Sequence, residues 1–402
     1  MSKNIWVINQ FAGTDKSGWG ERHYYFSKRW HEKGYNVTII SGSYNHVFNN
    51  LPDAPEKYNF EEVKGINFCW IKVPKYNPRS FMRFWSFFIF TLKSYFVPHK
   101  MAGKPDYIIV SSMPIFPVVT GYLLKKRYKA KKFIFEIRDL WPLTLIHLGG
   151  FSKSHPAVKF LGWFEKFGYK YADAIVSLLP NAKKHINDIA NAGHKFHYIP
   201  NGLDNSVLNK EPLDDYIEDN IPEDKFIIGY TGTIGLANAL EYFVEAAELL
   251  KEDDRFHFVI IGDGYLKSEL KERSGNYGNI TFFDKIEKNK VASAIELFDV
   301  CFVGRNDSPL FKHGVSANKY FDYMLAGKPI LDSNNYIKDP VELSGCGVIV
   351  KPESSVLIKK AIERMYEMSS KELKELGEKG KYYVTKHHNI SFLADKYIDL
   401  FE

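Results

Sequence analysis

Two short stretches of this 402-residue sequence place charged side chains where they could act on a substrate. One is Arg138-Asp139, which directly follows residues 133–137, a mainly apolar segment typical of a buried strand. A carboxylate at this point could accept the proton of an attacking hydroxyl or stabilise positive charge in a transition state. A structural ion pair between Arg138 and Asp139 is the alternative interpretation, and the two residues alone do not decide between them.

The second stretch contains Lys319 and Asp322, three residues apart near the start of an expected helix. Ser316 is expected to cap this helix, and Gly327 with Pro329 to end it. A lysine in the first turn opposes the helix dipole unless a bound anion compensates, so Lys319 indicates a phosphate. Asp322 would share its face and could bind both ribose hydroxyls. An exposed ion pair between Lys319 and Asp322 is the alternative.

Glycine-containing loops follow several expected strands, and their backbone amides could approach a phosphate or a sugar. The loop at 13–20 lacks the third glycine of a dinucleotide motif, because His23 stands there, and no acid follows the second strand. A nicotinamide cofactor is therefore disfavoured, and plain turns remain the alternative for each loop. We assign eight residues to the binding of the donor nucleotide. They are Gly18, Gly20, Gly232, Thr233, Gly262, Arg305, Lys319 and Asp322.

Parallel sheets must position these residues, because short Val/Ile-rich runs alternate with helical segments in both halves of the chain. Expected strands cover residues 5–8, 36–40, 67–73, 106–111, 132–137, 173–178, 196–199, 225–230, 256–261, 279–282, 299–303, 329–332 and 347–350. The fold class is α/β, with two Rossmann-like, doubly wound domains whose strand ends face a central cleft. Expected domains are 1–203, 204–385 and a final helix, 386–402, that packs back on the first domain.

Composition restricts the class of protein further. The net charge of +6 suits an anionic partner, such as a nucleotide phosphate or an acidic lipid surface. Three widely separated cysteines indicate reduced thiols in the cytoplasm, without a disulfide or zinc site. The opening apolar run, Ile5 to Ile8, is too short for a signal peptide.

An aromatic and basic stretch, residues 79–96, includes Arg83, Phe84, Trp85 and Phe88. It is far shorter than the roughly 20 apolar residues of a membrane-spanning helix. A helix apolar over most of its surface and fringed by basic residues could lie in the membrane interface instead. The alternative is a helix buried against the sheet.

Taken together, several motifs resemble those of family 4 glycosyltransferases, and the resemblance spans nearly the whole chain. They are the loop before Glu21-Arg22, residues 135–142, 198–204 and 262–264, and residues 319–329. Within this family, the sequence resembles the branch from capsule and O-antigen gene clusters that includes N-acetylfucosamine transferases. The family usually has two glutamates, where this chain has Gly314 and Asp322, and a histidine, where it has Arg138. Retention of configuration, usual in the family, is therefore left open.

The resemblance implies a metal-independent GT-B enzyme that moves N-acetylfucosamine, or another N-acetylamino sugar, from a UDP-sugar to a saccharide. The implied acceptor is a polyprenyl diphosphate-linked saccharide in capsule or O-antigen biosynthesis. The expected location is the cytoplasm, peripherally on the inner leaflet of the membrane, and no nucleic acid partner is expected. A nucleotide-sugar 2-epimerase of the same fold and a non-catalytic binding protein of polysaccharide assembly are the alternatives.

Overall fold

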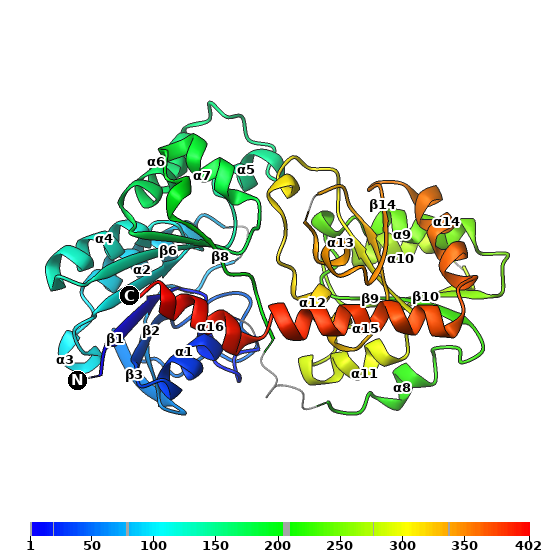
Figure 1. The fold of residues 1–402 in the computed structure, drawn as a ribbon, viewed down its shortest axis with the longest axis horizontal. Coiled ribbons are helices and arrows are strands. Elements are labelled where there is room, and N and C mark those ends of the chain that lie inside the picture. The colour runs from blue at the N-terminus through cyan, green and yellow to red at the C-terminus, as the bar shows by residue number, and fades with distance from the viewer. Residues whose placement is uncertain (1, 19, 78–79, 204–209, 276, 337) are drawn as a thin grey trace. The chain divides into compact units, whose positions relative to one another are not determined.

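The computed structural model describes residues 2–18, 20–77, 80–203, 210–275, 277–336 and 338–402 (Figure 1). The chain divides into two compact units. The first unit comprises residues 1–201 and 390–402, and the second comprises residues 202–389. The corresponding boundaries expected from the sequence are 203 and 385.

The first unit is built on an eight-stranded sheet of order β3-β4-β2-β1-β5-β6-β7-β8, parallel except for the β3-β4 pair. Its strands are β1 Asn4–Ile8, β2 Asn36–Gly42, β3 Tyr58–Val63, β4 Ile66–Ile71, β5 Tyr107–Ser111, β6 Lys132–Ile137, β7 Ala174–Ser177 and β8 Phe196–Tyr198. Its helices are α1 Arg22–Glu32, α2 Met82–Tyr95, α3 His99–Ala102, α4 Pro117–Tyr128, α5 Leu143–His147, α6 Pro156–Tyr171, α7 Ala182–Ala190 and α16 Ile390–Asp399. Because β2 and β5 lie on opposite sides of β1, the winding direction reverses between β1 and β5.

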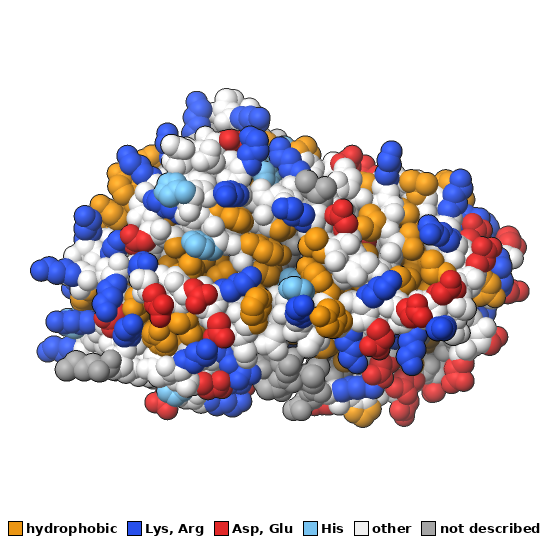
Figure 2. Space-filling view, in the orientation of Figure 1, with side chains coloured by type: hydrophobic (Ala, Val, Ile, Leu, Met, Phe, Trp, Pro, Cys, Tyr) orange, Lys and Arg blue, Asp and Glu red, His pale blue; other side chains and the backbone are white. Residues whose placement is uncertain are grey.

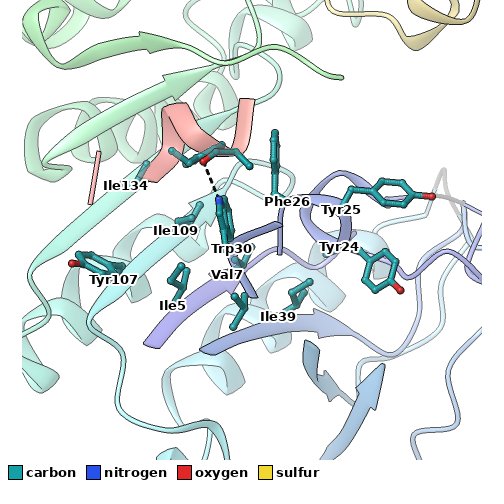
Figure 3. Packing of buried hydrophobic residues seen from close by; sticks show 14 of the residues in the cluster. Ile5, Val7, Tyr24, Tyr25, Phe26, Trp30, Ile39, Tyr107, Ile109 and Ile134 are labelled. Atoms are coloured by element: carbon teal, nitrogen blue, oxygen red, sulfur yellow. Dashed lines mark hydrogen bonds between the residues drawn. The ribbon is translucent and has the colours of Figure 1, made fainter. Parts of the chain in front are cut away.

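The final helix, α16, belongs to the core of the first unit. Leu393, Ala394 and Tyr397 are buried among side chains of β1, β2 and α1. The indole Nε1 of Trp30 in α1 donates to the Ala394 carbonyl at 3.2 Å, as Figure 3 shows. The hydrophobic core of this unit is therefore closed by a segment that follows the whole of the second unit in sequence.

The second unit has a six-stranded parallel sheet of order β11-β10-β9-β12-β13-β14. Its strands are β9 Phe226–Thr231, β10 Phe256–Ile261, β11 Ile280–Phe283, β12 Val300–Gly304, β13 Ile330–Ser333 and β14 Gly347–Val350. Its helices are α8 Asp215–Glu218, α9 Leu240–Leu249, α10 Lys267–Ser274, α11 Val291–Glu296, α12 Asn318–Leu325, α13 Pro340–Ser344, α14 Ser355–Tyr366 and α15 Ser370–His387. Two hydrophobic clusters fill this unit, with Val259 and Val303 in one and Phe258 and Phe302 in the other. Successive strand residues thus alternate between the clusters.

The predicted fold class is confirmed, because each unit is a doubly wound α/β sheet. The antiparallel edge strand β3 was not predicted, since its residues are only half-buried or exposed and lack a continuous apolar run. The predicted cap at Ser316 is wrong: α12 begins after Ala317, without a side-chain cap. No described helix is both long and apolar enough to cross a bilayer.

Candidate functional site

The candidate site of the second unit lies where the winding of its sheet reverses, between β9 and β12. The chain runs from β9 outward to β10 and β11, and then returns to β12 on the other side of β9. In open α/β sheets, ligands bind outside the carboxyl ends of the strands at this reversal. The loop of residues 232–239 follows β9, and Arg305 directly follows β12. Both segments are thus positioned by the strand order.

Near the end of β9, a single neutral oxygen accepts hydrogen bonds from two cationic side chains. The Asn238 side-chain oxygen Oδ1 accepts from Arg305 Nη1 at 2.7 Å and from Lys319 Nζ at 3.1 Å. The Asn238 amide Nδ2 donates to the Thr233 carbonyl at 2.9 Å, which fixes the orientation of the side chain. The guanidinium of Arg305 and the ammonium of Lys319 therefore converge on one carboxamide.

Tyr230, the penultimate residue of β9, holds Lys319 from a second side. Its hydroxyl donates to the Thr233 carbonyl at 2.6 Å and accepts from Lys319 Nζ, also at 2.6 Å. The Lys319 ammonium also lies 4.0 Å from the centre of the Tyr230 ring, within cation-π distance. Lys319 therefore uses neutral partners, and the alternative of a Lys319–Asp322 ion pair is wrong.

Neither cation of this cluster forms an ion pair with a carboxylate of the described residues. Burial, together with the charge of Arg305, lowers the pKa of Lys319 well below its ordinary value. An anion bound here would offset the repulsion between Arg305 and Lys319, and it would therefore raise the pKa of Lys319 and favour its protonated form. The amides of Thr233 and Gly235 also lack an acceptor among the described residues. Two cations and open amides make this cluster suited to bind a phosphate group.

Glycine is required where two loops of the cluster touch. A Cβ atom on Gly262, after β10, would lie 1.9 Å from the Gly232 carbonyl oxygen. A Cβ atom on Gly232 would lie 3.4 Å from the Lys319 side chain, in ordinary contact, and Gly232 has a φ of 137°. Gly262 therefore lets the loop after β9 pass close to the end of β10, and the positive φ of Gly232 favours glycine at that position.

The residues assigned from the sequence to one donor site fall into two groups. Gly232, Thr233, Gly262, Arg305, Lys319 and Asp322 belong to the second unit, whereas Gly18 and Gly20 belong to the first. Asp322 is half-buried in α12, three residues after Lys319. Sequence reasoning missed Tyr230 and Asn238, although an amide residue shortly after a glycine loop was a usable signal.

In the first unit, Arg138 and Asp139 directly follow β6. Asp139 is exposed and Arg138 half-buried, and no ion pair joins them, so the expected alternative of a structural Arg138–Asp139 pair is wrong. Gly20 has a φ of 81°, and a Cβ atom there would lie 2.0 Å from the Phe11 carbonyl oxygen, so only glycine fits this turn. Trp19, in the same loop, and Asp204, in the motif 198–204, lie outside the described residues.

A buried carboxylate fixes the strand that leads to Arg138 and Asp139. Glu136, fully buried near the end of β6, accepts from Arg22 Nη2 at 3.0 Å and from Ser111 Oγ at 2.8 Å. The Tyr397 hydroxyl of α16 also donates to it, and His23 Nε2 lies 3.0 Å away. Burial alone would raise the pKa of Glu136, but Arg22, His23 and the Tyr397 hydroxyl hold that pKa well below its ordinary value.

Arg22 extends this network to the end of the first unit. Its Nη2 donates to the Ile199 carbonyl at 2.8 Å, and its Nη1 donates to the Pro200 carbonyl. One guanidinium therefore joins β6, through Glu136, to the segment where the chain leaves this unit. Sequence reasoning gave Glu136 no such role, because strand alternation says only that it points away from Asp139.

Comparison with protein families and curated proteins gives concordant results for this chain. The model described as Glycosyltransferase Family 4 matches residues 18–207, and that described as Glycosyl transferases group 1 matches residues 225–368. The chain is 24% identical over 275 residues to a probable glycosyltransferase, WbjE, of Pseudomonas aeruginosa, covering 66% of this chain and 68% of WbjE. It is 25% identical over 265 residues to the putative colanic acid biosynthesis glycosyl transferase WcaI of Escherichia coli K12, covering 62% and 64%, respectively.

Solved structures share the fold at low sequence identity. Sucrose-phosphate synthase of Thermosynechococcus elongatus superposes with a TM-score of 0.74 at 17% identity, covering 100% of this chain and 98% of that one. HepE of Anabaena, solved in complex with UDP, gives a TM-score of 0.66 at 11% identity, covering 99% of each chain. The fold is therefore GT-B, with two Rossmann-like domains.

A second buried carboxylate, that of Asp332, lies near the end of β13 and contacts helix α12. Asp332 Oδ2 accepts from the Tyr320 hydroxyl at 2.8 Å, whereas its Oδ1 has no hydrogen-bond partner among the described residues. Burial and the nearby charge of Asp339 raise the pKa of Asp332 to about 8. Asp332 is therefore mainly protonated at neutral pH.

We expect Asp332→Asn to stabilise the second unit in a pH-dependent way. An unfolded aspartate titrates near pH 3.9, so between about pH 4 and pH 8 the folded wild type holds a proton that the unfolded chain releases. The free energy of unfolding of the wild type should fall over this window, whereas asparagine does not titrate. The difference between variant and wild type should grow to the order of 5 kcal/mol near pH 8 and then level off.

Urea denaturation followed by circular dichroism from pH 4 to pH 9 measures this difference. A difference that stays constant over that range would show that Asp332 titrates normally.

Proposed function

Because this chain belongs to the family 4 glycosyltransferases, we propose that it transfers a sugar from a UDP-sugar to a lipid-linked saccharide in surface polysaccharide biosynthesis. The observation that carries the choice of donor is the convergence of Arg305 and Lys319 on Asn238, without a carboxylate partner among the described residues. A nucleoside diphosphate offers the anionic oxygens that these groups lack. UDP in the HepE structure, and the colanic acid function in the name of WcaI, support the proposal.

The donor diphosphate would bind between Arg305, Lys319 and the amides of Thr233 and Gly235. As the bond between the sugar and the diphosphate breaks, negative charge builds up on the leaving group. Fixed cations and amides stabilise that charge more effectively than mobile water can, because they need no reorganisation. Asp322, one helical turn beyond Lys319, is our candidate for the ribose hydroxyls.

Asp139 is our candidate for the group that meets the acceptor. Its carboxylate is exposed at the end of β6, and the buried Glu136 network fixes the backbone immediately before it. It would accept the proton of the attacking hydroxyl or stabilise positive charge on the sugar ring, with Arg138 beside it. The transferred sugar that we propose is N-acetylfucosamine or another N-acetylamino sugar, on the basis of the motif resemblance.

The acceptor that we propose is a polyprenyl diphosphate-linked saccharide, reached from the inner leaflet of the membrane. Helix α2 buries Ser86, Phe87 and Phe90 but exposes Phe84, Trp85 and Phe88. The ring of Phe88 lies 6.4 Å from that of Phe160 in α6.

The apolar surface therefore continues from α2 onto α6, where Trp163 is 55% exposed. Figure 2 shows basic side chains interspersed with hydrophobic ones along the edge formed by α4 and α6. Such a surface suits an anionic bilayer. Arg83 lies in the first turn of α2, and Arg79 lies outside the described residues.

We expect Lys319→Ala and Arg305→Ala each to weaken UDP binding roughly 10- to 100-fold, because each removes a charge-assisted hydrogen bond to phosphate. Isothermal titration calorimetry measures the affinity. The control is Lys360→Ala, which removes an exposed lysine of α14 and should bind UDP normally. Equal UDP affinity in all four proteins would refute the donor assignment.

We expect Asp139→Asn to lower kcat by roughly 100- to 10,000-fold, the usual contribution of a general base, while UDP affinity stays within a few fold. Asparagine keeps the size of the side chain, so the melting temperature should not change. Steady-state kinetics with saturating donor, together with calorimetry, separate the two effects. A parallel loss of UDP affinity and turnover would point to a structural role for Asp139.

We expect the triple variant Phe84→Ser, Trp85→Ser and Phe88→Ser to lose binding to vesicles that contain phosphatidylglycerol, yet to bind UDP normally. Serine removes the apolar surface that would enter the interface, worth roughly 25 cal/mol per Å². Flotation at low and high salt measures binding, which should weaken with salt. Tyr216→Ser, an exposed aromatic position of the second unit, is the control.

Phe88 also stacks on Phe116, so a melting curve must accompany the flotation assay, and Trp85→Ser alone provides a milder variant. A wild type that never floats would end the membrane proposal.

A further inference from the structure

A cavity of about 400 Å³ lies wholly within the first unit, between α5, α6 and α7. Its apolar wall includes Pro142, Leu143 and Ile146. Pro142 stands three residues after Asp139 in the sequence, so the segment that follows the candidate acceptor carboxylate forms part of the cavity wall. A volume of this size suits a ligand of one or two sugar rings.

One buried carboxylate of this cavity has an oxygen to spare. Glu165 of α6 is 3% exposed and lines the cavity. Its Oε1 accepts from the Tyr169 hydroxyl at 2.9 Å and lies 2.7 Å from His185 Nε2. Its Oε2 accepts no hydrogen bond from any described residue. A carboxylate oxygen without a donor is a strong acceptor for a sugar hydroxyl.

Three lysines of the same cavity have no acidic partner. Lys153, Lys159 and Lys166 line it, and none forms an ion pair with a described carboxylate. Asp188, which also lines it, is paired with Lys184 at 2.6 Å. The cavity therefore has an excess of positive charge at its margin, which favours an anionic group on the ligand.

Helix α6 connects this cavity to the apolar surface described above. Gly162, Glu165 and Lys166 line the cavity, whereas Phe160 is exposed on the opposite face. The exposed Trp163 follows the cavity-lining Lys159 by four residues, so it lies between these two faces. A ligand with a lipid tail could place the tail at the aromatic face and its polar headgroup at the margin of the cavity.

We propose that this cavity binds the phosphorylated saccharide headgroup of the lipid-linked acceptor. The lysines take the phosphate, Glu165 accepts from a sugar hydroxyl, and the wall of Pro142, Leu143 and Ile146 packs on the sugar ring. This inference rests on the proposed function, because it assigns the acceptor to a place in the first unit.

The test uses two soluble probes, N-acetylglucosamine 1-phosphate and inorganic phosphate, titrated by calorimetry into the full chain saturated with UDP. UDP occupies the donor site, so any remaining affinity reports on another place. We expect Lys159→Ser combined with Lys166→Ser to weaken both probes roughly tenfold. Lys170→Ser, an exposed lysine of α6 outside the cavity lining, is the matched control and should bind both probes as the wild type does.

Glu165→Gln distinguishes the sugar from the phosphate. Glutamine keeps an acceptor for Tyr169 but loses the charge, so the preference for the sugar phosphate over inorganic phosphate should fall roughly tenfold. Melting temperatures show whether each variant is folded. Probe affinity unchanged by the cavity variants, or reduced equally by Lys170→Ser, would overturn the proposal. Failure to bind UDP at all would instead refute the proposed donor, and that result is independent of the probes.

Discussion

The chemistry available to the second unit depends on two cationic side chains that donate hydrogen bonds to the same neutral oxygen. Arg305 and Lys319 both donate to Asn238 Oδ1, and neither forms an ion pair with a described carboxylate. Folding alone gains little from such an arrangement, because like charges brought together in a partly buried place raise the free energy. The sheet nevertheless imposes it, because the loop after β9 and the residue after β12 meet where the winding reverses. A bound diphosphate would offset the repulsion between Arg305 and Lys319, and this would contribute to its affinity.

In the first unit, buried hydrogen bonds fix the strand that precedes the exposed carboxylate of Asp139. Asp139 is not held by an ion pair with Arg138; the strand before it is anchored through Glu136 instead. The anchor includes Tyr397 from α16, a helix that completes the core of this unit through Leu393 and Ala394. The end of the chain is thus connected to the backbone that presents Asp139.

Much of this architecture could be predicted from the sequence, because buried parallel strands leave continuous apolar runs. Lys319 could also be singled out from the sequence, because a positive charge in the first turn of a helix interacts unfavourably with the helix dipole. Asn238 and Tyr230 could not, because their roles depend on how a loop folds over the strand ends, and many residue types are compatible with a loop. Glu165 was missed for another reason: in the sequence it resembles any acidic residue of an amphipathic helix, and only packing reveals that it is buried.

The central claim is that the cation pair recognises the diphosphate rather than the nucleoside. The most direct measurement compares the affinities of the wild type for uridine, UMP and UDP by calorimetry at two salt concentrations. The second phosphate should meet Arg305 and Lys319, so UDP should bind at least roughly tenfold more tightly than UMP, and the gap should narrow as salt rises. Equal affinity for UMP and UDP at low salt would contradict the account.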